Sequence, residues 1–230
     1  MPEWRTYTLS DLQSFSLQTY YRLFELYNAA IWPGQFVALG SGLHLPHWGS
    51  GLHPRRGRLI AAILAGCWLW IAIGFHATRY STLSWVAVYF AWGFGIEAAL
   101  LIWAGVIRGR LVFGPRVDAI EGAGRWIFFF ALLVQPLIGR LLGREWRQIE
   151  IFGVAPDPTA VATLGILLLA TGRVRWELIA LPVLWCAISG AMLAAMGAPD
   201  AWITLVAALL AVTLAAWRTL ARRRSQRRAI

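Results

Sequence analysis

The sequence predicts an all-α fold, a polytopic transmembrane helix bundle of about seven spans preceded by an amphipathic interfacial helix. Three observations lead to this prediction. Hydrophobic residues make up 59% of the 230 residues and charged residues only 14%, a ratio that a water-facing globular surface does not tolerate. Apolar runs recur at lengths close to the roughly 20 residues that cross about 30 Å of hydrocarbon. The basic residues gather between these runs and at the C-terminal end.

The chain divides into three parts on this interpretation: an amphipathic interfacial segment (1–26), a transmembrane bundle (27–218) and a basic tail (219–230). In the first part, apolar residues recur at spacings of three or four, which predicts a helix, with Ser10 or Asp11 available as its N-cap. The segment also carries Tyr20, Tyr21 and Tyr27. Tyrosines suit the headgroup zone, so we expect a membrane anchor, with a lid over an outward cavity as the alternative.

Seven apolar segments are candidate spans. They are 27–45, 59–76, 83–107, 125–142, 153–171, 177–196 and 200–218. The first is the weakest, because Asn28, Pro33 and Gln35 dilute it, although no charged residue lies between Glu25 and Arg55. The third is the longest, and tilt can absorb its excess length.

Arginine counts predict the orientation, because cytoplasmic connections carry the excess of positive charge. With seven spans, 15 arginines fall on the side of the C-terminal tail and six on the side of the N-terminus. We therefore expect a cytoplasmic C-terminus and an external N-terminus. The tail sequence ARRRSQRR then serves as a topological anchor on anionic lipid, or alternatively binds a specific partner.

Composition also excludes several classes of function. Retinal is held on a lysine amine, and this chain contains no lysine. The arginines form no stripe interleaved with aromatic residues, which argues against nucleic-acid binding. Cys67 and Cys186 lie inside apolar runs and form no CxxC pair, so a disulfide scaffold is excluded.

No cofactor or metal site is expected, and no enzyme motif is recognisable. His44, His47 and His53 lie in HLPHWGSGLHPRR, where the proline and glycines indicate an interfacial loop. Neither carboxylate nor cysteine accompanies them to complete a coordination shell. His76 ends the second span, at the predicted interface.

Glu97 lies near the middle of the third span. A carboxylate at that depth is costly when it faces lipid and normally faces the protein interior. It is either part of a proton or cation relay or a protonated residue satisfied by a neighbouring helix. Gln135, followed by Pro136 in the fourth span, is a second polar position at membrane depth.

The segment FGVAPDPT, residues 152–159, places Asp157 before Pro158. An aspartate cap followed by proline at the first helical position is typical of a helix start. We therefore predict that Asp157 caps a helix beginning at Pro158. The apolar residues before it either dip into the outer membrane face or form an ordinary interfacial loop.

A family resemblance is carried by this segment and by generic membrane sequence around it. The quoted runs are IEIFGVAPDPTAVATLGILLLA, LLVQPLIG upstream, PVLWCAISGAMLAAMGAPDAWITLVAALLA downstream and YNAAIWPGQ near the start. Together they resemble an uncharacterised family of bacterial multi-pass membrane proteins with an FGV-x-P-x-PT loop. The resemblance implies a bacterial cytoplasmic membrane and a structural loop of Phe152, Gly153, Pro156, Pro158 and Thr159. A cysteine is frequent in that family at the position of Asp157, so a thiol-based role does not apply here.

Two classes of function remain. The first is a channel or secondary transporter for protons or a small solute, with Glu97, Gln135 and Asp157 as candidate residues. The second is a non-catalytic accessory or assembly subunit of a larger membrane complex. The expected partners are the lipid bilayer and either further copies of this chain or other subunits.

Overall fold

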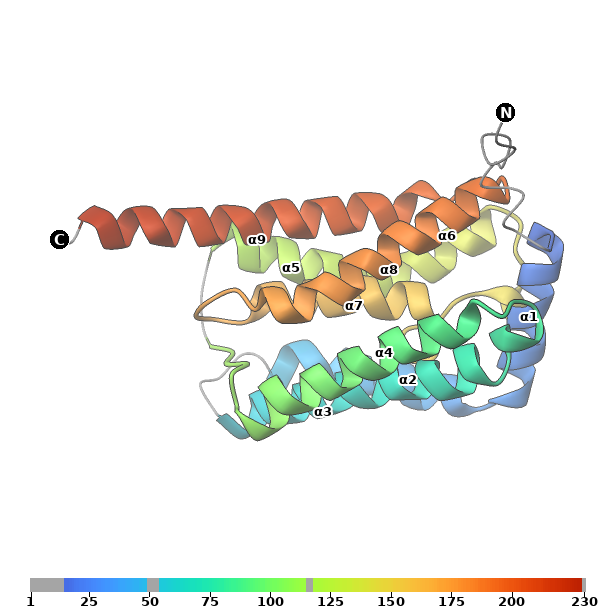
Figure 1. The fold of residues 1–230 in the computed structure, drawn as a ribbon, viewed down its shortest axis with the longest axis horizontal. Helices are drawn as coiled ribbons and strands as arrows, with labels where there is room; N and C mark the ends of the chain where they lie inside the picture. The colour runs from blue at the N-terminus through green and yellow to red at the C-terminus, as the bar shows by residue number, and fades with distance from the viewer. Residues whose placement is uncertain (1–14, 49–53, 115–117, 229–230) are drawn as a thin grey trace, which may run out of the picture.

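The structure is a computed structural model that describes residues 15–48, 54–114 and 118–228 (Figure 1). Its α-helices are α1 (Leu17–Ala30), α2 (Gly34–Trp48), α3 (Pro54–Trp70), α4 (Ala87–Leu101), α5 (Ala119–Phe129), α6 (Gln135–Leu141), α7 (Pro156–Leu169), α8 (Trp176–Ala195) and α9 (Trp202–Arg228). Among the described residues, the extended structure is an isolated antiparallel bridge between Val112 and Thr171. The all-α prediction is confirmed.

Wider π-helical turns lengthen three of these helices. They are η2 (Ile71–Ala77) after α3, η4 (Ile102–Ile107) after α4 and η5 (Phe130–Val134) between α5 and α6, and the short 3-10 turns are η3 (Tyr80–Thr82) and η6 (Trp146–Gln148). In η2 the amide of Thr78 donates to the Ile73 carbonyl five residues earlier, at 3.0 Å. Because the turns continue the hydrogen-bonded backbone, α3 with η2 and α5 with η5 and α6 each form one long helix.

Five helical stretches are long and apolar enough to cross a membrane. They are Arg55–Thr82, Ala87–Ile107, Ala119–Leu141, Trp176–Ala195 and Trp202–Gln226. The membrane-helix character is therefore supported, but the number of seven spans is not confirmed. The described α2 has 15 residues and α7 has 14. At about 1.5 Å per residue, α7 covers roughly 21 Å, less than the hydrocarbon thickness of about 30 Å.

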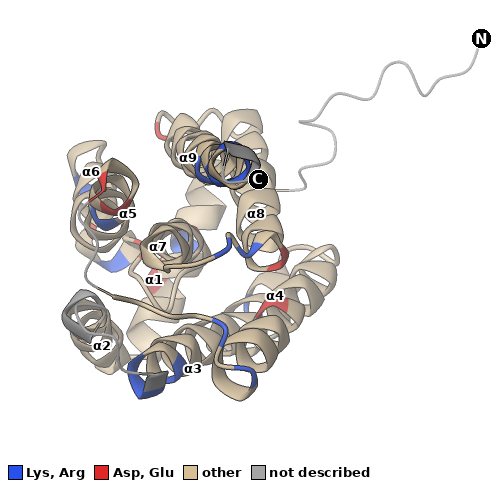
Figure 2. Ribbon diagram, turned by 90° about the vertical axis from the view of Figure 1, so that its left-hand side faces the viewer, with Lys and Arg blue, Asp and Glu red and all other residues tan. Residues whose placement is uncertain are grey.

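The long helices lie side by side, and α1 crosses one end of the bundle, opposite the C-terminus (Figure 1). We call these the α1 end and the arginine end. Viewed from the arginine end, α7 lies in the middle of the surrounding helices (Figure 2). Every residue of α7 from Pro156 to Leu168 is buried. A helix that is apolar all round is stable only when enclosed, so α7 is the core of the bundle.

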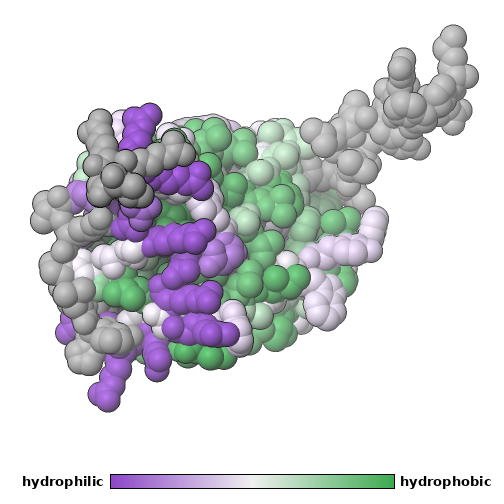
Figure 3. Space-filling view, turned by 60° about the vertical axis from the view of Figure 1, so that its left-hand side comes forward, coloured by the Kyte–Doolittle hydropathy of each residue, from purple (hydrophilic) through white to green (hydrophobic). Residues whose placement is uncertain are grey.

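The two ends differ in charge as the arginine count predicts. Arginines surround the arginine end in Figure 2, and a hydrophilic band covers it in Figure 3, where the surface toward the α1 end is hydrophobic.

Helix α1 begins at Leu17 with Ser16 as its N-cap, whose Oγ accepts from the Thr19 amide at 3.3 Å. The predicted caps Ser10 and Asp11 lie outside the described residues. Tyr20 and Tyr27 are buried and pack in a cluster of aromatic rings around Phe75. The prediction that these two tyrosines face the headgroup zone is therefore wrong, because the bundle itself covers the apolar face of α1.

Candidate functional site

The segment before α7 is non-helical, as the FGVAPDPT pattern predicts, and it is buried inside the bundle. Phe152 is fully buried, and Gly153 has φ +82°. The Gly153 amide donates to Thr159 Oγ1 at 2.8 Å, and that hydroxyl donates to the Ala155 carbonyl at 2.7 Å. Thr159 thus ties the segment to the first turn of α7. Its depth relative to a membrane surface stays a prediction.

Asp157 does not cap the helix, so that prediction is wrong. The helix begins at Pro156 with Ala155 at the N-cap, two residues earlier than predicted. Both prolines of the segment then lie in the first turn, where missing N–H groups cost little. The Asp157 side chain instead reaches α8, where its carboxylate accepts from Trp185 Nε1 at 2.8 Å and from Ser189 Oγ at 2.7 Å.

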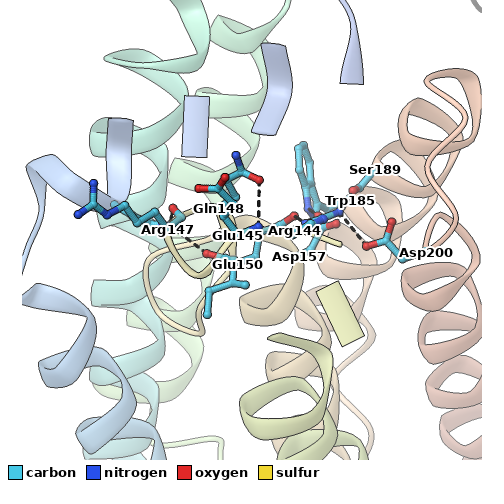
Figure 4. A network of polar contacts seen from close by, with 11 residues as sticks. Arg144, Glu145, Arg147, Gln148, Glu150, Asp157, Trp185, Ser189 and Asp200 are labelled. Carbon is cyan, nitrogen blue, oxygen red and sulfur yellow. Dashed lines mark hydrogen bonds and ion pairs between the residues drawn. The ribbon is translucent and has the colours of Figure 1, made fainter. Parts of the chain in front are cut away.

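A buried ion-pair network lies at the α1 end (Figure 4). The Arg144 guanidinium, in the turn after α6, is 2.8 Å from Glu150 Oε1 and 2.7 Å from Asp200 Oδ2. It also lies 4.3 Å from the ring centroid of Tyr21 on α1. Arg144 and Glu150 are only 5% and 6% exposed. We call Arg144, Glu150, Asp157 and Asp200 the ionic cluster.

All four residues of the ionic cluster line one cavity of ≈ 20 Å³, together with Gln135 and Pro136. That volume accommodates about one water molecule. Several polar atoms of these residues have no hydrogen-bond partner among the described residues. They are Arg144 Nε, Glu150 Oε2, Asp200 Oδ1 and Gln135 Oε1. Buried polar groups are normally satisfied, so the cavity can accept a water molecule or a small ion at these atoms.

The ionic cluster contains three carboxylates and one guanidinium. Burial raises the pKa of Glu150, and the negative charge of Asp157 raises it further, against the opposing effect of Arg144. Burial works against the charge on Arg144, but Glu150 and Asp200 offset this and raise its pKa above the ordinary value. The guanidinium therefore stays charged, and the excess negative charge favours proton uptake by Glu150.

Glu97 is fully buried in α4, so the prediction that it points inward is confirmed. Neither carboxylate oxygen has a hydrogen-bond partner within the described ranges. The structure does not bring Glu97 into the cavity of the ionic cluster, whereas it does bring Gln135 there. The three predicted candidates thus occupy two separate places.

His76 was expected at the membrane interface, but this prediction is wrong: the side chain is fully buried inside the bundle. Its ring centroid lies 4.6 Å from that of Phe94 and 5.0 Å from that of Trp185, the side chain that donates to Asp157. His44 and His47 belong to helix α2 rather than to a loop, and His53 lies outside the described residues. In the described part of the chain, no group of three His, Cys, Asp or Glu residues is arranged to hold a metal ion.

Sequence reasoning missed Arg144, Glu150 and Asp200. The arginine count treats Arg144 only as a marker of orientation and leaves out both carboxylates, and Asp200 is the first residue of the predicted span 200–218. One signal was available: the seven-span topology places the connection at 143–152 and the connection at 197–199, directly before Asp200, on the same side of the membrane. Opposite charges in neighbouring connections can meet, but only the packing of α6, α7 and α9 shows that these do.

Fold and site define an α-helical protein of membrane character, with a buried ionic cluster at the N-terminus of a half-length central helix. Residues 17–226 match the model of a family described as a family of unknown function (DUF6064), and the chain belongs to this family. No curated protein and no solved structure matches the chain. The expected uncharacterised family is thereby supported. The association of the FGV-x-P-x-PT loop with it stays a prediction.

Proposed function

We propose that this protein is an integral membrane transporter that moves protons, alone or together with a small solute, and that the ionic cluster is its proton-binding site. The observation that carries the proposal is the sharing of one buried guanidinium by Glu150 and Asp200, with Asp157 on the same cavity. Full ionisation would leave two uncompensated negative charges away from water, at a high energetic cost. Proton uptake removes this cost.

The position of the cluster supports transport. In many secondary transporters, shortened or broken helices place a helix N-terminus and unwound backbone at the binding site. Here the non-helical segment at 149–155 leads into α7, which begins next to the cluster. The positive end of the α7 dipole stabilises ionised carboxylates, whereas burial favours their protonated form. These opposing effects keep the site close to a change of protonation state.

Glu97 is the second proton-carrying group in the proposal. It lies inside α4, is shielded from the surface and has no hydrogen-bond partner among the described side chains. In the proposed orientation, the arginine end faces the bacterial cytoplasm. The ionic cluster then lies toward the outer face, and Glu97 lies farther into the bundle on α4.

Proteoliposomes that enclose a pH-sensitive dye test this function. A potassium diffusion potential drives the flux, and the initial rate of internal pH change is measured. We expect flux with the wild type, and loss of that flux with Asp157→Asn, Glu150→Gln and Glu97→Gln. Glu177→Gln is the matched control, because Glu177 is 44% exposed at the start of α8. A wild-type rate equal to that of empty liposomes, at either polarity, would refute proton transport.

The accessory-subunit alternative rests on a different feature, a largely aromatic face formed by α4 and the turn directly before it. Trp85, Tyr89, Trp92 and Ile96 are 52–74% exposed and follow one another at spacings of four, three and four residues, along one side of the helix. A partner helix could pack on this face. Purification in mild detergent distinguishes the two functions: a stoichiometric second subunit, released by Trp92→Ala, would favour the accessory role.

A further inference from the structure

We propose that a groove at the α1 end binds one anionic phospholipid with a hydroxyl-bearing headgroup. The groove has a volume of ≈ 690 Å³ and lies between the end of α1, the start of α2 and the connection at 146–151. This volume is within the range of small-molecule sites, about 300–1,000 Å³. The proposal concerns a different site from the ionic cluster, and it rests on the membrane location but not on proton transport.

Buried side chains hold the walls of the groove in place. Asn28 Nδ2 donates to the carbonyls of Arg147 and Ile149, at 2.8 and 2.9 Å, and so fastens the connection to α1. Gln35 Nε2 donates to the Asn28 carbonyl at 2.7 Å and fastens α2 to α1. Asn28 thus joins the adjacent helices α1 and α2 to a connection about 120 residues away in sequence, which makes the groove a built feature of the fold.

The walls are suited to an acyl chain. The apolar side chains that line the groove are Trp32, Phe36, Leu39, Trp146, Ile149 and Ile151. Trp32 and Phe36 are 65% and 62% exposed, and their rings meet edge to face at 5.1 Å. Aromatic side chains exposed beside a groove mark binding surfaces when they are contiguous. In a chain of this membrane-helix character, the neighbouring amphiphile is lipid.

The polar groups of the groove specify the headgroup. Arg147 is exposed and lines the groove, and no lining residue is acidic, so an anionic phosphate is the matching partner. Gln35 is 6% exposed, and its Oε1 has no hydrogen-bond partner among the described residues. An amide oxygen only accepts hydrogen bonds, so it calls for a donor such as a headgroup hydroxyl.

The groove and the ionic cluster share a wall. Ile149 and Ile151 line the groove, whereas Glu150 between them lines the cavity of the cluster. Successive side chains of an extended segment point to opposite faces. A lipid in the groove therefore packs against the backbone that positions Glu150.

Native mass spectrometry of the full-length protein in detergent tests the proposal, with phosphatidylglycerol and phosphatidylcholine of the same acyl chains as probes. We expect preferential retention of phosphatidylglycerol. Arg147→Gln should weaken that binding by about five-fold and leave phosphatidylcholine unchanged, because one basic group contributes roughly that factor at an anionic surface. Phe36→Ala should weaken both lipids, because it removes part of the apolar wall.

Two matched controls separate the groove from the general surface. Val37→Ala removes a neighbouring exposed side chain outside the groove, and Arg22→Gln removes an exposed arginine of α1; neither should change lipid retention. Equal retention of both lipids by the wild type, or equal losses in the controls, would overturn the proposal. Glycerol phosphate bound as tightly as the intact lipid would overturn it as well, since the acyl chain would then have no role.

Discussion

The indole Nε1 of Trp185 donates to Asp157 Oδ1 at 2.8 Å, while the Ser189 hydroxyl donates to the other carboxylate oxygen at 2.7 Å. All three side chains are buried. The two bonds fasten the first turn of α7 to α8 and hold the carboxylate on one side of the cluster cavity. Asp157 is therefore an acceptor between helices, not a cap within one.

Substitutions of Asp157 should follow this geometry. Asp157→Ala leaves two buried donors unpaired, at a cost of about 1–3 kcal/mol for each unsatisfied group, more than the loss of a cap at about 1 kcal/mol. Asp157→Asn retains one acceptor oxygen and should lose less stability than Asp157→Ala, but it should not be silent. Thermal unfolding in detergent measures both. An unchanged Asn variant together with a loss of only about 1 kcal/mol in the Ala variant would restore the capping role.

Arg144 should be among the most sensitive positions for stability. Arg144→Gln leaves the buried Glu150 and the partly buried Asp200 without their counter-charge, and breaking a buried pair typically costs about 3–5 kcal/mol. Arg173→Gln is the control, because Arg173 is exposed in the connection before α8, where substitutions usually change stability by roughly 0.5 kcal/mol or less. Equal unfolding temperatures for the two variants would contradict the network.

The stability of the protein should depend on pH through Glu150. Burial, reinforced by Asp157 and opposed by Arg144, raises its pKa from 4.5 to about 8 in the folded protein. Because the folded protein binds this proton more tightly than the unfolded chain does, protonation of Glu150 contributes to the free energy of unfolding. That contribution is fully present below about pH 4.5 and is lost as the pH rises through about 8. The unfolding temperature should therefore fall over this interval, and Glu150→Gln should flatten the curve. A wild-type curve that rises with pH would reverse the assigned direction.

An alanine substitution at Gly153 tests how closely the segment before α7 is packed. Its φ is +82°, and a Cβ atom would lie 2.9 Å from Ala38 Cβ and 3.2 Å from Cys67 Sγ. Gly143 has φ +96°, but a Cβ atom there would meet nothing within 4 Å. Gly143→Ala should therefore cost only the left-handed strain, about 1–2 kcal/mol, and Gly153→Ala should cost more. Equal losses of unfolding free energy would show that the close packing of Gly153 is unimportant.

Topology is the last prediction, and reporter fusions check it. A reporter after Ile230 should be cytoplasmic and one at Met1 external, because of the arginine asymmetry. Helix α1 and the last turn of α9 lie at opposite ends of the bundle (Figure 1), which agrees with termini on opposite sides of a membrane. Five spans and seven spans both place the two termini on opposite sides. Reporters on the same side would require an even number of spans.

Composition and periodicity were sufficient for the class of fold, because lipid-facing helices must be long and apolar regardless of their neighbours. The energetic cost of a carboxylate in lipid likewise predicted correctly that Glu97 faces the protein interior. Composition and periodicity failed for Tyr20, Tyr27 and His76, since an amphipathic or aromatic side chain looks the same in the sequence whether a headgroup or another helix covers it.

The sequence by itself therefore determined the helical membrane character, the charge asymmetry and the non-helical character of the segment at 152–155. Only the tertiary structure decided that Asp157 bonds to α8 and that Arg144 joins Glu150 to Asp200. The physical reason is distance along the chain. Arg144 and Asp200 are 56 positions apart, and no local propensity specifies a pairing that depends on how α6, α7 and α9 pack.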